Sequence, residues 1–476
     1  MNGGIIASNF VWRFMERVCA QVVSLTVAIV LARLLEPSVF GIIAIVMIFI
    51  NIMQVFVDSG LGTALIQKKQ ADDIDFSSVF YFNMLMCLIV YALIFIGAPL
   101  ISKLYDNEGL TLIIRVVGLT VIASGIKSIQ QSYVSRTMQF KKFFWSTLIG
   151  TIISAIIGIL MAYKGMGVWA LVAQSLSKTI IDTFILWLTV KWRPKLLFSF
   201  QRLKGLISYG WKILIASLIS VIYANSRQLI IGKFYTLDDL AFYNKGNEFP
   251  NKIVPNVETA VVNILLPTVS QVQDDMEKVH LITRKAIKLL AYVISPMMIG
   301  MAACSDNLIL VLLTEKWLQS VPFLRVFCIE AILWPLSAVL NNTIKAVGRS
   351  DLNLLIQIIT RVIGIGSIFL VINVGPYAIA IFALIITILE FFIVSTVNKK
   401  VVGYSFIELF SDIFPSLILA LVMGFCVYLI GLVPGVKSLV LLVQLLTGVG
   451  VYLIISIVVK YKPLYDILFL VKKKKG

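Results

Sequence analysis

The sequence predicts an all-α integral membrane protein of about fourteen transmembrane helices. Of its 476 residues, 59% are hydrophobic and only 14% are charged, whereas a soluble domain is nearer half apolar and a quarter charged. A folded chain of this length still exposes much of its area. The apolar surface must therefore meet lipid.

The apolar residues form blocks that are long enough to cross a bilayer as helices of about twenty residues. They lack the ten-residue alternation that is typical of the strands of a membrane barrel, so helices are expected throughout. The expected spans lie near residues 11–31, 39–61, 79–101, 110–133, 143–163, 168–190, 206–231, 240–268, 282–304, 320–345, 352–373, 377–397, 414–432 and 439–459.

The distribution of Lys and Arg predicts the orientation of these spans. One set of alternate connections holds roughly 24 of these residues and the other set roughly 6, which is a strong positive-inside bias. Both termini are therefore expected in the cytoplasm, with the chain in the inner membrane of a bacterium. The net charge of +17 needs no nucleic-acid partner. The basic end, Lys472–Lys475, is expected to lie on anionic membrane lipids.

An internal repeat predicts the domain organisation. Gly167-Val168-Trp169-Ala170 and Gly375-Pro376-Tyr377-Ala378 each open an expected helix, and several other weak matches follow in the same order at a similar offset. Six helices in each unit make the repeat parallel. We expect two pseudo-symmetric six-helix lobes, residues 1–198 and 199–400, followed by two peripheral, lipid-facing helices and a basic tail in residues 401–476.

Basic residues recur at membrane depth, where an uncompensated charge is costly. They lie in polar stripes at helical spacing in both predicted lobes, and bases outnumber acids there. A wet cavity between the lobes with a positive lining accounts for both facts, and such a lining suits a phosphate group. Internal ion pairs and snorkelling side chains stay open as the alternative. The candidate cavity residues are Arg13, Arg17, Lys127, Lys178, Arg227, Lys245 and Lys252.

Four acids at membrane depth are candidates for coupling transport to an ion: Asp58, Asp182, Glu248 and Glu258. At least one is expected to carry a proton or to pair with a sodium ion, and a static salt bridge with a nearby lysine is the alternative for each. No other cofactor is expected. A single histidine, unpaired cysteines and the absence of a P-loop sequence predict no metal site, no ATP-driven pump and no enzyme.

The sequence also resembles the Wzx-type polysaccharide flippases, within the superfamily of the peptidoglycan lipid flippases and the MATE drug exporters. The resemblance covers nearly the whole chain and is closest to the colanic-acid-exporter-like branch. It is carried by Val11-Trp12-Arg13, Ala32-Arg33-Leu34-Leu35-Glu36-Pro37, Asp58-Ser59-Gly60-Leu61-Gly62, Phe242-Tyr243-Asn244-Lys245 and Leu265-Leu266-Pro267-Thr268.

This resemblance implies a MATE-like fold and a flippase that works by alternating access. Its implied cargo is an undecaprenyl-pyrophosphate-linked oligosaccharide, and the surface polysaccharide polymerase is an implied partner. Arg13, Arg17 and Arg227 are the residues expected to hold the pyrophosphate. Two alternatives stay open. A cation-coupled drug exporter shares the fold, although a cationic drug favours excess acid; a membrane glycosyltransferase or polymerase is expected to carry a sizeable outer domain, and the loops here are short.

Overall fold

The computed structural model describes residues 3–58, 60–68 and 70–466, with the backbone alone for residues 3–11, 13, 14, 17 and 209. The chain divides into two compact units, Met1–Ala241 and Phe242–Gly476. This division falls later in the chain than the predicted lobe boundary, because α8 (Phe200–Phe234) packs against α2, α3 and α4 of the first unit. The predicted repeat and its boundaries stay predictions.

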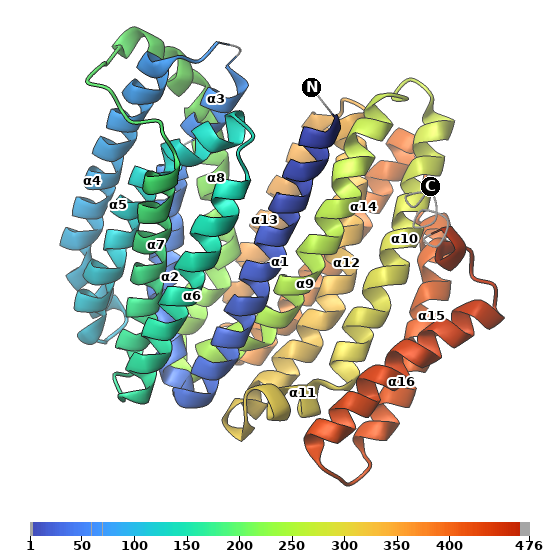
Figure 1. Cartoon of the computed structure of the whole chain (residues 1–476). Helices are drawn as coiled ribbons and strands as arrows, with labels where there is room; N and C mark the ends of the chain where they lie inside the picture. Colours follow the sequence, from blue (N-terminus) through green and yellow to red (C-terminus); the bar gives the residue numbers. More distant parts are fainter. Residues whose placement is uncertain (1–2, 59, 69, 467–476) are drawn as a thin grey trace. The chain divides into compact units, whose positions relative to one another are not determined.

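The first unit is a bundle in which α6 packs against both α1 and α7, and α5 packs against α4 and α7 (Figure 1). α2 contacts α5 and α8. Apart from α8, the helices are α1 (Gly3–Leu34), α2 (Pro37–Asp58), α3 (Leu61–Gln67), α4 (Asp73–Leu104), α5 (Gly109–Arg136), α6 (Lys141–Tyr163) and α7 (Val168–Thr189).

In the second unit α12 packs against α10 and α14, and α15 packs against α10 and α16. α9 (Leu237–Ser270) begins in the first unit and lies mostly in the second. The other helices are α10 (Met276–Ala303), α11 (Ser305–Leu312), the 3₁₀ helix η1 (Glu315–Ser320), α12 (Val321–Ala346), α13 (Ser350–Val371), α14 (Pro376–Val402), α15 (Phe406–Gly431) and α16 (Lys437–Val458).

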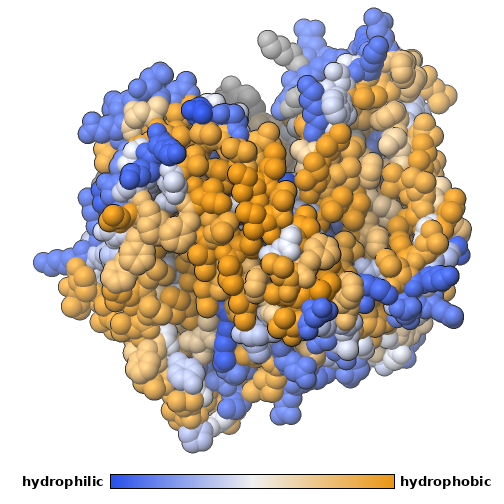
Figure 2. Space-filling view, turned by 180° about the vertical axis from the view of Figure 1, so that it is seen from behind, coloured by the Kyte–Doolittle hydropathy of each residue, from blue (hydrophilic) through white to orange (hydrophobic). Residues whose placement is uncertain are grey.

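The helices confirm the predicted all-α membrane fold. Within the described residues, 13 helices are long and apolar enough to cross a membrane, and α1 contributes a shorter apolar helix over Val18–Leu34. Each of the predicted blocks corresponds to one of these. Figure 2 shows hydrophobic residues over the middle of the visible face, with hydrophilic residues gathered toward its upper and lower ends.

The acidic segment before α4 has a structural role. Asp72 and Asp75 form a reciprocal capping box at the start of the helix, which satisfies otherwise unpaired backbone donors. Asp75 also accepts a hydrogen bond from Lys68 Nζ at 2.6 Å. The Arg202 guanidinium hydrogen-bonds Asp72 and lowers the pKa of that carboxyl to about 2. These contacts hold the start of α4 against Lys68, which follows α3, and against Arg202 of α8.

The second predicted span, residues 39–61, corresponds to α2, and the short helix α3 follows it after a turn. α2 ends at Asp58 and α3 begins at Leu61, with Gly60 between them at a φ of +69°, where a side chain is strained. A Cβ at Gly60 would also lie 2.9 Å from the Gly210 carbonyl oxygen. The Arg136 side chain at the end of α5 donates to the carbonyl oxygen of Leu65 in α3 at 2.7 Å and to that of Lys68, just after α3, at 2.6 Å. The turn and α3 are therefore held by α5 and α8.

The start of α2 approaches the start of α9 within the first unit. A Cβ added at Gly41 would lie 2.1 Å from the Leu237 carbonyl oxygen, whereas a Cβ at Gly97 on α4 meets nothing within 4 Å. We expect Gly41→Ala to lower the stability of the protein by about 1–3 kcal/mol through this backbone clash. We expect Gly97→Ala, the matched control, to leave it unchanged or higher. Thermal unfolding of the purified protein measures both, and equal midpoints for the two variants would contradict the close approach.

Candidate functional site

Charged side chains of α9 form a compact network in the second unit. Lys245 Nζ donates to Glu248 at 2.7 Å, and Lys252 bonds the other oxygen of the same carboxylate. These residues stand at i, i+3 and i+7 of the helix, so they share one face. Two lysines to one glutamate leave an excess of one positive charge. The sequence analysis expected these lysines to line a cavity and left ion pairing as the alternative; the structure pairs both lysines with Glu248.

Lys245 is the most enclosed member of this network. Lys245 is only 5% exposed. Its Nζ lies 5.3 Å from the centre of the Trp317 ring, which is a cation–π distance. α9 approaches α12 closely beside it, because a Cβ at Gly246 would lie 2.8 Å from the Leu324 nitrogen. α9 continues as one helix through Pro250, Pro255 and Pro267.

A second ion pair lies inside the first unit. Lys127 Nζ of α5 contacts Asp182 Oδ2 of α7 at 2.7 Å, and the two side chains are 16% and 14% exposed. α6 lies against the same stretch of α7, since a Cβ at Gly150 would be 3.2 Å from the Asp182 Cβ. Asp182 therefore stands as the partner of Lys127.

The third predicted acid, Asp58, lies at the break between α2 and α3. Its carboxylate accepts from Gln54 Nε2 at 3.4 Å, and it lines a cavity of about 230 Å³ together with Asn83, Ser128 and Ser132. Asn83 donates to Ser128 Oγ at 2.8 Å. The Asn83 Oδ1 atom is buried without a hydrogen-bond partner in the described structure. The cavity therefore offers several oxygen atoms at the turn between α2 and α3.

The remaining candidate residues lie on α1, α7, α8 and α9. Arg13 and Arg17 lie on α1, and their side chains fall outside the described residues. Lys178 is exposed on α7, and Arg227 is half-buried on α8. Glu258 is half-buried on α9 and has no ion pair within the part of the chain that is described.

A row of unsatisfied polar atoms follows α12. Trp334 Nε1, Ser337 Oγ and Asn341 Oδ1 are buried without a hydrogen-bond partner among the described residues. Their spacing of three and four places them on one helical face, which also carries Glu330, hydrogen-bonded to Thr387 at 2.9 Å. Buried polar atoms without partners are rare because they cost free energy. This face is therefore suited to a polar ligand or to water.

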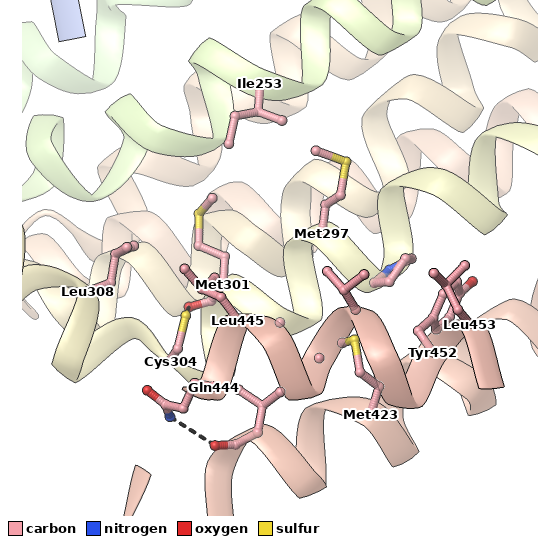
Figure 3. A pocket seen from close by; sticks show the side chains of 15 residues that line it. Ile253, Met297, Met301, Cys304, Leu308, Met423, Gln444, Leu445, Tyr452 and Leu453 are labelled. Carbon is pink, nitrogen blue, oxygen red and sulfur yellow. Dashed lines mark hydrogen bonds between the residues drawn. The ribbon is translucent and has the colours of Figure 1, made fainter. Parts of the chain in front are cut away.

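An apolar cavity of about 380 Å³ lies among α9, α10, α11, α15 and α16. Figure 3 shows Ile253 of α9 on one side and Met297 and Met301 of α10 below it, with Met423 and Leu445 further along. Sequence reasoning did not find this cavity. Each wall carries residues at helical spacing, such as Met297 and Met301 on α10 or Leu445 and Val449 on α16, but these helices are far apart in the sequence, so no local pattern indicates that they meet.

These features define a multi-pass helical membrane protein whose helices carry internal ion pairs and enclose an apolar cavity. A family model described as "Polysaccharide biosynthesis protein" matches residues 30–322, and the chain belongs to this family.

The chain is similar to two curated proteins of polysaccharide biosynthesis. The succinoglycan biosynthesis transport protein ExoT of Rhizobium meliloti (strain 1021) is 24% identical over 352 residues, 73% of this chain and 71% of ExoT. The lipopolysaccharide biosynthesis protein WzxC of Escherichia coli (strain K12) is 21% identical over 334 residues, 68% of this chain and 66% of WzxC.

Solved structures show the same fold. The lipid II flippase MurJ in its inward closed conformation superposes with a TM-score of 0.76 at 16% identity, covering 95% of this chain and 99% of MurJ. An inward-facing multidrug resistance MATE family transporter of the MOP superfamily gives a TM-score of 0.63 at 13% identity, covering 82% and 98%. The predicted resemblance to Wzx-type flippases, the MOP fold and the absence of an enzymatic role are confirmed.

The α9 network yields a prediction about stability. Glu248→Gln leaves Lys245 buried beside Trp317 without its carboxylate, and breaking a buried pair in this way costs about 3 kcal/mol. Lys252→Gln keeps the Lys245–Glu248 pair, so we expect a smaller loss. Thermal unfolding of the two purified variants compares them, and an equal or larger loss for Lys252→Gln would show that Lys245 does not depend on Glu248.

Proposed function

We propose that this protein flips an undecaprenyl-pyrophosphate-linked oligosaccharide from the cytoplasmic to the outer face of a bacterial inner membrane by alternating access. The observation that carries the proposal is that one helix, α9, holds both kinds of surface such a lipid needs. Lys245 and Lys252 supply positive charge, and Ile253, the next residue, lines the apolar cavity. A polyprenyl pyrophosphate has an anionic head joined directly to an apolar chain. The flipped lipid-linked oligosaccharide would serve the assembly of O-antigen, capsule or exopolysaccharide.

The pyrophosphate is assigned to the basic residues. Pyrophosphate oxygens match the two-pronged geometry of Arg, and each such contact is a strong charge-assisted hydrogen bond. Arg13, Arg17 and Arg227 therefore take the leading role. Lys127, Lys178, Lys245 and Lys252 add positive charge.

The oligosaccharide is assigned to the unsatisfied face of α12. Sugar hydroxyl groups both donate and accept hydrogen bonds, and the face offers a donor at Trp334 Nε1 and an acceptor at Asn341 Oδ1. Each new bond would remove the cost of a buried, unpaired atom.

A drug exporter for cations is less well supported. Of the four candidate acids, only Asp58 and Glu258 have no ion pair among the described residues. A cationic cargo favours excess acid, but Asp182 is paired with Lys127 and Glu248 is paired with two lysines. The excess of base around these acids favours an anionic cargo.

The arginine assignment predicts a graded loss of transport. Arg→Lys at Arg13, Arg17 or Arg227 keeps the charge but loses the paired contacts, so transport should fall several-fold. Arg→Ala should lower it about tenfold or more, because each charge-assisted bond contributes about 1.5–3 kcal/mol. The measurement is restoration of surface polysaccharide in a flippase-null strain, with membrane levels of each variant quantified by immunoblotting.

Arg349→Ala is the matched control, because Arg349 is exposed and pairs only with the neighbouring Asp351 among the contacts described. It should restore polysaccharide fully. Full restoration by the three alanine variants would contradict the pyrophosphate assignment. Loss of those variants from the membrane would show instead that the arginines hold the fold together.

We further propose that a proton or a sodium ion drives the return step through the cavity at Asp58. The cavity combines a carboxylate, the unpaired Asn83 Oδ1 and the hydroxyl groups of Ser128 and Ser132, and sodium prefers such oxygen ligands. The cavity also lies at the turn between α2 and α3, where the carbonyl end of α2 adds negative potential.

This coupling predicts a loss of ion dependence in Asp58→Asn. Transport of the lipid-linked oligosaccharide in vesicles should respond to an imposed sodium or proton gradient in the wild type and much less in the variant. Asp351→Asn serves as the control, since Asp351 is exposed and pairs with Arg349. An unchanged gradient response in Asp58→Asn would rule out this cavity. Indifference of the wild type to both gradients would rule out coupling.

A further inference from the structure

A second cavity in the second unit is basic. It measures about 470 Å³ and lies between α10, α15 and the segment that follows α16. Its lining shares no residue with the apolar cavity of Figure 3. Its charged residues are Arg284, Lys285, Lys288, Lys462, Asp412 and Asp466.

A buried carboxylate organises one wall of this basic cavity. Asp412 is 2% exposed, and its Oδ1 accepts from Arg284 Nη2 at 2.9 Å and lies 3.0 Å from Lys288 Nζ. The Tyr404 hydroxyl donates to Asp412 Oδ2 at 3.0 Å. The two cations are thus fixed in place, and one acid compensates only one of them.

Two further lysines extend the positive lining. Lys285 and Lys462 are exposed and have no ion pair in the described part of the chain. The segment that carries Lys462 is held against α15, because the Tyr461 and Ser416 hydroxyl groups lie 2.9 Å apart. With Asp466 as the other acid, the lining keeps an excess of two positive charges.

The basic cavity continues into apolar surface along both helices. On α15, Ser411 and Pro415 line it, and Phe414 and Ile418, on the same helical face, are 45% and 42% exposed. On α10, Leu281 lines it and is 57% exposed. In a membrane-spanning bundle such surface meets acyl chains.

We propose that this cavity binds the headgroup phosphate of an anionic phospholipid, with the acyl chains against the exposed face of α15. A fixed pair of cations, two accessible lysines and an adjoining apolar surface match a phosphate that is joined to acyl chains. Basic pockets between helices at the cytoplasmic side of a membrane bind such headgroups. The inference concerns a resident lipid and does not rest on the identity of the transported cargo.

The test uses the full-length protein purified in detergent. Native mass spectrometry counts bound phosphatidylglycerol and phosphatidylcholine, and a thermal-shift titration gives the apparent affinity for each. We expect phosphatidylglycerol to bind preferentially and to raise the unfolding midpoint. The double variant Lys285→Gln/Lys462→Gln should weaken phosphatidylglycerol binding roughly tenfold or more, because each lysine contributes independently to an anionic lipid.

The matched control is Lys399→Gln/Lys400→Gln, which removes the same charge from exposed positions at the end of α14. It should bind phosphatidylglycerol as the wild type does. Equal weakening in both double variants would overturn the site and indicate non-specific attraction to the basic face. Equal stabilisation by inorganic phosphate or glycerol phosphate would overturn the lipid assignment in favour of a soluble anion.

Discussion

Hydrocarbon offers no hydrogen-bond partner, so a charged or polar group inside the membrane must be paired within the protein or reached by water or ligand. This constraint governs how the helices are joined. Lys127 and Asp182 link α5 to α7 across 55 residues of sequence. Gln444, 1% exposed on α16, accepts from Asn307 of α11 at 3.0 Å and donates to the Val427 carbonyl of α15 at 2.8 Å. Gln444 thereby attaches α16 to both α11 and α15.

Some buried polar atoms of the described residues have no hydrogen-bond partner. Asn83 Oδ1 and the α12 row of Trp334, Ser337 and Asn341 have no partner among the described residues. Each would cost about 1–3 kcal/mol if it stayed unpaired. The fold tolerates this cost at a cavity beside Asp58 and along one helical face.

The features that depend on neighbouring residues of the sequence could be predicted. The apolar blocks predicted the spans, and the helical spacing of Lys245, Glu248 and Lys252 placed them in one polar stripe, for which ion pairing was the alternative to a cavity lining. The predicted span 39–61 matches α2 to within a few residues, but the short helix α3 that follows it was not predicted. Contacts across long stretches of sequence had no local signal. Arg284 and Asp412, which are 128 residues apart, meet only because α15 packs against α10, and the apolar cavity depends on five helices.

The same arrangement of charge occurs twice in the second unit. Glu248 holds Lys245 and Lys252 on α9, and Asp412 holds Arg284 and Lys288 between α15 and α10. One carboxylate between two cations keeps both side chains ordered and still leaves a net positive charge. An incoming phosphate must share these cations with the carboxylate, which weakens its binding compared with an unpaired pair of bases. For a transporter this is useful, because a cargo that is held too tightly shifts the conformational equilibrium toward the bound state and is not released. Under both proposals, the internal acids weaken the binding of an anion and the bases favour it.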